Sequence, residues 1–561
     1  MRRGEISPKK IMEKEKLKPK LFSVMKTYTK EQFVKDVVAG IIVAIIALPL
    51  SIALALASGV TPEKGIYTAI VAGFVISFLG GSRVQIAGPT AAFATIVAGI
   101  VARAGMDGLI IATITAGIIL ILMGLFRFGS LIKFIPYTIT TGFTAGIAVT
   151  IFIGQIKDFL GLTIVTEEPL IDTMDKLSAD FRFIATINWW ALGVGALCMV
   201  ILIAWPYLPG FLNKIPASLI AVLVSSALVA LLNLPVNTIG DLYTISAKLP
   251  AFSLPHADLK TIESLVPDAF TIAILAGIES LLSCVVADSM VNSRHRSNME
   301  LVAQGAGNIA SALFGGIPAT GAIARTAANI KNGGRTPIAG MVHSVTLLLI
   351  LVVLMPYAAL IPMPAIAAIL FMVAYNMCGW REFVNLCKTA PKSDILVLVL
   401  TFVLTVVFDL VVAIEVGLIL TCILFMKRMS DVTEVAGWKY VEPEDDPEGT
   451  MMNVPKNTVV YEITGPMFFG AADKLLKIAV QDNAKCLILR MRSVNAIDST
   501  AMRNFERLYK ECQKKKVTLI FSHVNSQPMS IMHKAGFYEE VGADNFCAHI
   551  NDAMKRAQDL Q

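Results

Sequence analysis

The chain has 561 residues, of which 55% are hydrophobic and only 16% are charged. A soluble protein of this length does not carry so apolar a composition, so we expect a polytopic membrane protein. The formal net charge of +6 does not indicate a nucleic-acid partner, because the basic residues are spread over the N-terminal tail and short loops without interleaved aromatic residues.

The chain opens on a lysine-rich stretch, residues 1–30, that leads directly into a long apolar segment. We expect a cytosolic tail there rather than a cleaved signal peptide. Spans of about twenty apolar residues, with shorter half-helices allowed, are predicted at 34–58, 65–80, 88–103, 108–126, 133–155, 187–205 and 215–233. After a polar loop that contains proline, seven more are predicted at 269–291, 299–314, 320–332, 335–356, 363–379, 393–408 and 410–427.

The loops between these segments predict the orientation of the chain. If the N-terminus is cytosolic, most loop lysines and arginines lie on the cytosolic side. The longer loops near 156–186 and 234–268 then lie outside, and they are acidic on balance. This asymmetry predicts an even number of spans with both chain ends in the cytosol. We expect a transport domain over residues 31–430, built from repeats at about 31–235 and 265–430.

Two stretches rich in small residues interrupt the apolar pattern at corresponding places in the two halves. They are GGSRVQIAGPTAAF at 80–93 and GGIPATGAIART at 315–326. Irregular backbone survives in a bilayer only where it is buried in protein or lines a cavity. A half-helix that begins there directs free N–H groups and its positive dipole end at that cavity, which favours an anion. The residues expected to offer N–H groups or hydroxyls to the anion are Thr90, Ala91, Ala92, Thr320, Gly321 and Ala322.

The odd number of segments in each half gives the two halves opposite orientations in the membrane. We therefore predict an inverted repeat in which the two third spans meet near the bilayer midplane.

Two charged residues stand out in the second half. Glu279 lies mid-span with apolar residues on both sides, and ionisable residues at such positions mark ion or proton pathways. We interpret it as the cation-coupling residue, titrated by a proton or ligating sodium; the alternative is a carboxylate bonded to a neighbouring helix. Arg325 lies about one turn into the second half-helix, where its permanent charge would attract the anion. The alternative for Arg325 is a structural pair with Glu279 or with a helix C-terminus.

The composition becomes polar and acidic over residues 431–456, which we interpret as a linker. Beyond it, strands are predicted at 458–463, 486–491 and 517–521, with helices near 470–480, 499–514, 526–535 and 545–558. This alternation predicts a small cytosolic α/β domain over 457–561 with a largely parallel sheet. Asp498 and Ser499 follow a strand end, where they either cap the next helix or form a phosphorylated or nucleotide-sensing regulatory loop.

The chain contains no Walker motif, HExxH or GxSxG sequence, and its eight cysteines lack metal-ligand spacing. We therefore expect neither an enzyme nor a metal site nor a cofactor, apart from a bound proton or sodium ion as the coupling ion.

The motifs together resemble the sulfate permease (SulP) family of anion transporters over nearly the whole chain. The resemblance is carried by ALPLSIA at 47–53, IAGPT at 86–90, GIESLL at 277–282 and GGIP through Arg325. Downstream, GPMFFGAA at 465–472 and IDST at 497–500 resemble the STAS domain that ends such transporters. The resemblance implies fourteen spans as a seven-plus-seven inverted repeat with core and gate domains, an elevator-like movement and a homodimer. It implies a substrate site between the third and tenth spans, beside the acid of the eighth span.

Two positions differ from patterns in that family. Many members have glutamine where Leu50 stands, and sodium-dependent bicarbonate members have a threonine near Ile323. Both positions are expected to contact the substrate. The variant at Leu50 and the sequence TGAIART at 320–326 most resemble the bacterial dicarboxylic-acid branch. That likeness implies proton-coupled uptake of a dicarboxylate such as succinate across the bacterial inner (plasma) membrane.

Other functions are compatible with the same residues. One is sulfate or bicarbonate transport, coupled to sodium or by anion exchange. Another is a membrane-anchored scaffold whose STAS domain binds a cytosolic protein. Nucleobase transporters share the fold type, but the STAS-like segment argues against them. The expected partners are a small anion, membrane lipid, a second copy of the chain and a cytosolic protein at the STAS domain.

Overall fold

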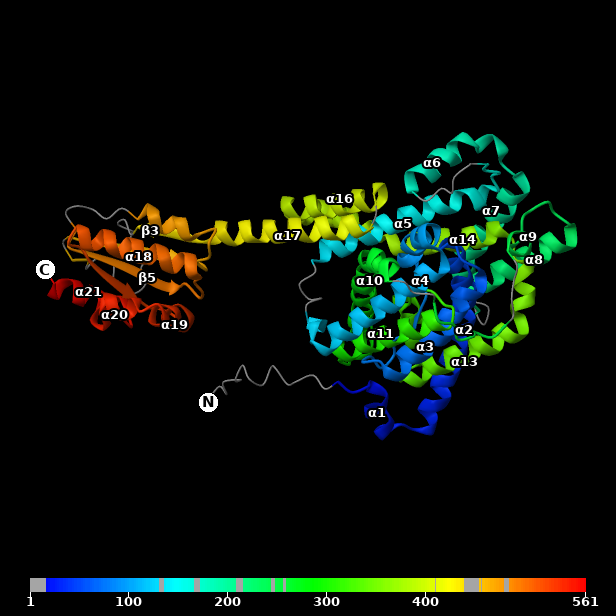
Figure 1. Cartoon of the computed structure of the whole chain (residues 1–561), viewed down its shortest axis with the longest axis horizontal. Coiled ribbons are helices and arrows are strands. Elements are labelled where there is room, and N and C mark those ends of the chain that lie inside the picture. The colour runs from blue at the N-terminus through cyan, green and yellow to red at the C-terminus, as the bar shows by residue number, and fades with distance from the viewer. Residues whose placement is uncertain are drawn as a thin grey trace. The chain divides into compact units, whose positions relative to one another are not determined.

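The computed structural model describes residues 17–130, 136–165, 172–207, 215–243, 248–255, 259–408, 410–437, 454–455, 457–478 and 484–560. The chain divides into two compact units, Met1–Leu418 and Ile419–Gln561, and each is described by itself. Figure 1 shows that the first unit is helical and that the second combines strands with helices.

Each predicted apolar segment corresponds to helical structure. In the first half these helices are α2 (Lys30–Ala57), α3 (Pro62–Leu79), α4 (Ala94–Leu125), α5 (Tyr137–Leu160), α7 (Trp189–Ala204) and α8 (Ala217–Leu232). Helix α4 covers two of the predicted segments, because the backbone of Gly105 leaves the helical region with φ +68° and ψ −170°. Only glycine adopts this conformation readily, so the two helical segments meet at a kink without a longer loop.

The second half repeats this order. Its helices are α10 (Leu259–Val291), α11 (Ser297–Leu313), α12 (Ile323–Lys331), α13 (Pro337–Leu354), α14 (Met363–Cys378), α16 (Lys392–Val407) and α17 (Leu410–Val432). Shorter helices lie between the spans or before them: α1 (Lys20–Val24), α6 (Thr173–Arg182), α9 (Ile239–Leu242) and α15 (Trp380–Thr389). By length and composition, eight helices among the described residues are able to cross a membrane unaided. Several of the others, such as α8 and α12, are shorter, as expected of half-helices and of spans that pack against protein.

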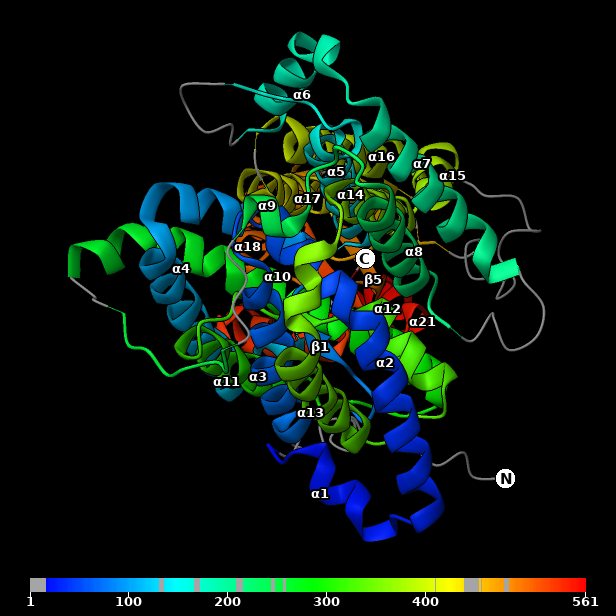
Figure 2. The same ribbon diagram turned by 90° about the vertical axis from the view of Figure 1, so that its right-hand side faces the viewer.

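The spans of the first unit form two groups. Helices α2, α3 and α4 pack against α10, α11, α12 and α13, whereas α5 and α7 pack against α14, and α16 packs against α5. Each group therefore combines helices from both halves of the chain, as an inverted repeat requires. Between the spans of the first group, β1 (Ala87–Gly88) pairs with β2 (Thr320–Gly321). Figure 2 places β1 amid α2, α3, α10 and α13.

The start of α2 is fastened to the start of α13 through one buried carboxylate. Asp36 is fully buried and accepts hydrogen bonds from Tyr28, Gln32 and Thr336, and from the backbone N–H of Arg335. A buried carboxylate is tolerated only when its oxygens are satisfied in this way. This contact joins a helix of the first half to a helix of the second half within the first group.

The second unit contains a five-stranded sheet in the order β3-β4-β5-β6-β7. The strands are β3 (Glu434–Gly437), β4 (Thr458–Thr464), β5 (Cys486–Ser493), β6 (Thr518–Ser522) and β7 (Phe546–Cys547). Strand β3 is antiparallel to β4, and the remaining neighbours are parallel. The helices are α18 (Ser499–Lys514), α19 (Ser526–Lys534), α20 (Phe537–Val541) and α21 (Ile550–Asp559). The predicted α/β domain with a largely parallel sheet is confirmed.

Three sequence predictions for this region need correction. The expected linker 431–456 contains the end of α17 and all of β3. Strand β3 was missed because it is four residues long and lies at the sheet edge with most of its side chains exposed, so no apolar alternation marks it. The helix expected near 470–480 is a 3-10 helix, Ala472–Lys477, and the one expected at 545–558 begins only at Ile550, after β7.

Candidate functional site

The two interrupted stretches cross each other as antiparallel extended backbone. Ala87 is paired with Gly321 and Gly88 with Thr320, and the N–H of Ala322 donates to the Ile86 carbonyl at 2.9 Å. Immediately after the crossing, one chain enters a 3-10 turn, Ala91–Phe93, and then α4, while the other enters α12. The predicted meeting of two half-helices is therefore present in this structure.

Both half-helices begin without a side-chain cap. Neither Thr90 nor Ala322 accepts a capping hydrogen bond through its side chain. The first N–H groups of a helix have no intrahelical partner, and the helix dipole places about half a positive charge at this end. Thr90 and Ala322 are half-buried, Ala91 and Ala92 are buried, and Ile323 is 47% exposed. The two N-termini can thus attract an anion.

Helix α10 contacts both stretches through two consecutive side chains. The hydroxyl of Thr90 donates to a carboxylate oxygen of Glu279 at 3.0 Å. The hydroxyl of Ser280 lies 2.6 Å from the Thr320 hydroxyl and accepts a hydrogen bond from the Gly321 N–H at 3.0 Å. Glu279 therefore lies at the first half-helix and Ser280 at the second. A change in the charge of Glu279 therefore changes the electrostatic potential at the start of the first half-helix. The prediction that the Gly321 and Ala322 N–H groups meet the anion needs correction, because they donate to Ser280 and to the Ile86 carbonyl.

Arg325 lies behind the crossing. Its side chain is 1% exposed, and Nη2 donates to the Pro89 carbonyl at 3.1 Å and to the Ser51 hydroxyl at 3.4 Å. Its Nε and Nη1 have no hydrogen-bond partner in the described part of the chain. Arg325 forms no ion pair with Glu279 among these residues, so the structural pair considered from the sequence is not formed here. The guanidinium instead contacts the residue that precedes Thr90.

Gly88 makes room for this guanidinium. A Cβ at position 88 would collide with Nη1 of Arg325. We predict that Gly88→Ala lowers anion uptake by about tenfold or more, equivalent to at least ~1.4 kcal/mol, because Arg325 must shift. The assay is initial uptake by the reconstituted protein. Gly99→Ala on α4 is the matched control, because a Cβ there meets no atom within 4 Å; equal losses in both variants would contradict the assignment.

A buried polar cluster supports the first stretch and was missed from the sequence. Glu300 on α11 accepts hydrogen bonds from the N–H groups of Gly81 and Ser82 and from the side-chain amides of Gln85 and Gln304. These four bonds satisfy a fully buried carboxylate. The spacing of Glu300, Gln304 and Asn308 at intervals of four residues, a polar stripe on one helix face, was the available signal.

We predict that Glu300→Gln lowers the free energy of unfolding by about 1–3 kcal/mol, because an amide presents a donor to groups that already donate. Thermal unfolding of the detergent-solubilised protein measures this. Glu382→Gln on α15, where the side chain is exposed, is the control. A Glu300→Gln variant as stable as this control would show that the cluster does not hold the stretch in place.

The remaining predicted residues lie in different surroundings. Leu50 is half-buried on α2, next to Ser51, which contacts Arg325. Asp498 lies in the second unit, where one carboxylate oxygen accepts from the Ala501 N–H at 2.9 Å and the other from the Phe469 N–H at 2.8 Å. It therefore caps α18, the first of the two roles considered. Ser499 is the exposed first residue of that helix.

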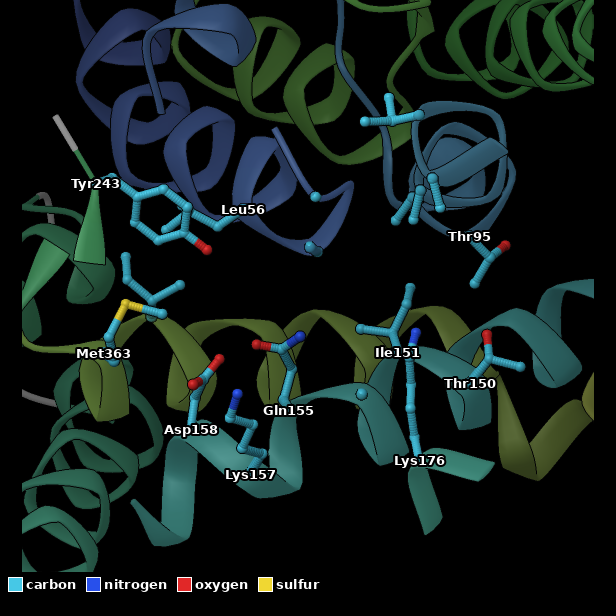
Figure 3. Close-up of a pocket in the computed structure, with 18 residues that line it drawn as sticks. Leu56, Thr95, Thr150, Ile151, Gln155, Lys157, Asp158, Lys176, Tyr243 and Met363 are labelled. Atoms are coloured by element: carbon cyan, nitrogen blue, oxygen red, sulfur yellow. The ribbon is translucent and has the colours of Figure 1, made fainter. Parts of the chain in front are cut away.

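A cavity of about 440 Å³ lies between the two helix groups. Its walls come from α2 and α4 on one side and from α5 and α14 on the other, with Lys176 of α6 and Tyr243 added (Figure 3). Ala94 and Thr95, the first residues of α4, are part of the lining. The cavity therefore begins within one turn of the first half-helix N-terminus.

The chain is similar in sequence to known membrane transporters. The model of the sulfate permease family matches residues 33–401, and that of the STAS domain matches residues 450–553. A putative sulfate transporter of Bacillus subtilis, YvdB, is 41% identical over 94% of this chain and 98% of its own length. The bicarbonate transporter BicA of a Picosynechococcus species is 28% identical over 93% of this chain and 94% of its own.

Solved structures show the same fold. Murine Slc26a9, an anion transporter in the inward-facing state, superposes with a TM-score of 0.87 at 18% identity, covering 97% of this chain and 94% of its own. The transmembrane domain of a cyanobacterial BicA superposes with a TM-score of 0.62 at 28% identity, covering 69% of this chain and 98% of its own. The fold class predicted from the sequence is confirmed.

Proposed function

Because the chain belongs to the sulfate permease family and is a multi-pass membrane anion transporter with a C-terminal STAS domain, we propose that it is a secondary active importer that couples small-anion uptake to protons. The observation that carries the proposal is the crossing of the two half-helices with Arg325 buried behind it. Two helix N-termini and one guanidinium bring positive charge to one point, and no acidic side chain among the described residues pairs with the guanidinium. An anion bound there supplies the missing negative charge.

Proton coupling is proposed to act through Glu279. When this carboxylate is ionised, its charge lies against the Thr90 hydroxyl and repels an anion at the same half-helix. A proton on Glu279 removes that repulsion, so anion and proton bind together more favourably than either alone. The same reciprocity lets a proton gradient drive anion uptake. Sodium at Glu279 is the alternative coupling ion.

An elevator-type movement is supported by the two helix groups. The half-helices, Glu279 and Arg325 all belong to the group built from α2–α4 and α10–α13, and the cavity separates this group from α5 and α14. If the first group slides as one body, the bound anion crosses the membrane without breaking its own contacts. In the predicted orientation, the cavity opens toward the outer loops.

A dicarboxylate such as succinate is our first candidate substrate, on the family likeness of the sequence around Leu50 and Arg325. Sulfate is the second candidate, favoured by the 41% identical relative named as a putative sulfate transporter, and bicarbonate follows from BicA. Liposomes loaded at pH 7.5 and diluted to pH 5.5, with labelled succinate or sulfate and with sodium replaced by choline, test the first two candidates. Bicarbonate is tested with an outside pH of 7.5, because acid converts it to CO2, which crosses liposomes unaided. Uptake that requires sodium, or that ignores the pH gradient, would contradict proton coupling.

The C-terminal domain is proposed to regulate transport and to bind a cytosolic protein, with the transporter working as a homodimer in the bacterial inner membrane. A scaffold whose main role is partner binding is the alternative. Uptake that survives removal of residues after 456, but is lost in Arg325→Gln, would count against the scaffold. Loss of partner binding with uptake unchanged would support regulation by the STAS domain as a separate activity.

A further inference from the structure

The cavity between the two helix groups presents hydrogen-bond donors that the proposed transport cycle does not use. They are the ammonium groups of Lys157 and Lys176, the amide of Gln155 and the hydroxyl of Tyr243, all in the cavity lining. Figure 3 shows the Gln155 and Lys176 side chains directed toward the gap between α5 and the helices opposite, with Tyr243 on the far side of that gap. Two helices and a loop thus converge on one space.

These donors have no partners in the described part of the chain. None of the four side chains takes part in a hydrogen bond or ion pair within the residues described. Gln155 is only 7% exposed, so its amide faces the cavity rather than open solvent. A buried polar group without a partner costs about 1–3 kcal/mol. Of the four side chains only Gln155 is buried; Lys176 and Tyr243 are half-buried and Lys157 is exposed. One buried amide, two ammonium groups and a phenol line the same cavity, which indicates a ligand that accepts hydrogen bonds and carries negative charge.

The charges near the cavity nearly balance, because the lining includes Asp158 as well as Lys157 and Lys176. Helix α5 contributes Lys157 and Asp158, and α6 contributes Lys176 and Asp180. Asp180 is 5% exposed, and one of its carboxylate oxygens has no partner among the described residues. Burial raises the pKa of Asp180 to about 6; Asp158 adds to the rise, and Lys157 and Lys176 oppose it. Protonation of Asp180 leaves the cluster with a net positive charge.

We propose that Lys157, Lys176, Gln155 and Tyr243 form an outer capture subsite that binds a sulfate-like oxyanion or a dicarboxylate before it reaches the half-helices. This inference rests on the proposed function, because it gives that site an entrance. The cavity lining runs along α4 from Ala94 to Ala102, which corresponds to about 12 Å of helix. An anion at the subsite therefore has a continuous path along α4 to its N-terminus.

Chemical protection of Lys176 tests the subsite without relying on transport. The full-length protein in liposomes is treated from outside with sulfosuccinimidyl acetate, which forms an amide at Nζ as N-hydroxysulfosuccinimide and a proton leave. Mass spectrometry measures the rate of acetylation at Lys176 and at the exposed control Lys260. The reaction is run with sodium sulfate or disodium succinate, and with sodium gluconate for comparison. Sulfate or succinate is expected to slow the acetylation of Lys176 about twofold at an anion concentration equal to its Kd, and about tenfold at ten times that Kd. Lys260 should be unaffected.

Two variants separate the subsite from the central site. Arg325→Gln should raise the anion concentration needed for half-maximal uptake but keep the protection of Lys176. Lys157→Gln should weaken the protection several-fold while keeping the elution profile of the wild type in size-exclusion chromatography. Protection that disappears in Arg325→Gln would overturn the proposal, because the lysine would then report only on the central site. Absence of protection in the wild type by both anions would also overturn it, whatever the result of the uptake assays.

The protection of Lys176, measured as the ratio of its acetylation rates without and with sulfate, should depend on pH. Because Asp180 gains a proton as the pH falls through about 6, protection should be stronger at pH 5.5 than at pH 7.5. Asp180→Asn should give the stronger protection at both values. Protection that weakens on acidification would contradict the charge balance on which the subsite depends.

Discussion

Replacing Glu279 by glutamine is expected to abolish anion uptake driven by a pH gradient while leaving anion binding intact. Glutamine has the shape of the protonated carboxyl group and can still accept a hydrogen bond from Thr90, but it cannot gain or lose a proton. The variant should therefore lose the response to a pH gradient, and uptake into liposomes loaded at pH 7.5 and diluted to pH 5.5 should fall at least about tenfold, or ~1.4 kcal/mol. Exchange of internal for external anion, which needs no net proton movement, should remain.

The matched control is Glu263→Gln, on the same helix α10 but with its side chain exposed. It should transport like the wild type. Uptake by Glu279→Gln that still follows the pH gradient would exclude Glu279 as the coupling residue. Loss of exchange together with uptake would instead support the structural interpretation, in which the carboxylate serves to bind the Thr90 hydroxyl.

Replacing Arg325 by glutamine should raise the concentration of anion needed for half-maximal uptake by about tenfold or more, because the permanent charge behind both half-helices is lost. Protein stability should not fall in parallel. The guanidinium is buried with two of its nitrogens unpartnered in the described part of the chain, and such a group costs folding energy rather than supplying it. Uptake kinetics and thermal unfolding, measured on the same preparation, separate the two effects.

The control for this variant is Arg103→Gln on α4, where the guanidinium is exposed and pairs with Asp268 at 2.9 Å. An exposed pair contributes about 0–1 kcal/mol, so neither uptake nor unfolding should change much. A large loss of stability in Arg325→Gln, with the half-saturating concentration unchanged, would assign the arginine to folding and remove it from the binding site.

The sequence predicts the crossing of the half-helices well, for a physical reason. Gly88, Pro89 and Gly321 are costly inside a membrane helix, so their occurrence in both halves marks the same irregular backbone twice. The contacts of the Arg325 side chain could not be predicted. Its guanidinium donates to Pro89 and Ser51, and both residues are more than two hundred positions away in the chain. Local spacing carries no information about such contacts.

The supporting residues were harder to predict than the site itself. Ser280 follows Glu279 directly, but one serine in an apolar span usually bonds to its own helix, so its contact with Thr320 had no separate signal. Glu300 lies near a predicted span end, where acids commonly face water, yet it is buried under Gly81 and Ser82. In both cases tertiary packing of the two halves decides the partner.

Equilibrium binding tests the central claim most directly, that the paired half-helices and Arg325 form an anion site. Purified wild-type protein and Arg325→Gln are titrated with succinate, sulfate, bicarbonate and gluconate by isothermal calorimetry at pH 5.5 and 7.5. At least one small anion should bind the wild type, more tightly at pH 5.5, and this affinity should fall about tenfold or more in the variant. Because the outer subsite should still bind an anion in Arg325→Gln, the contradicting result is equal affinity and equal stoichiometry of both proteins for every anion that binds.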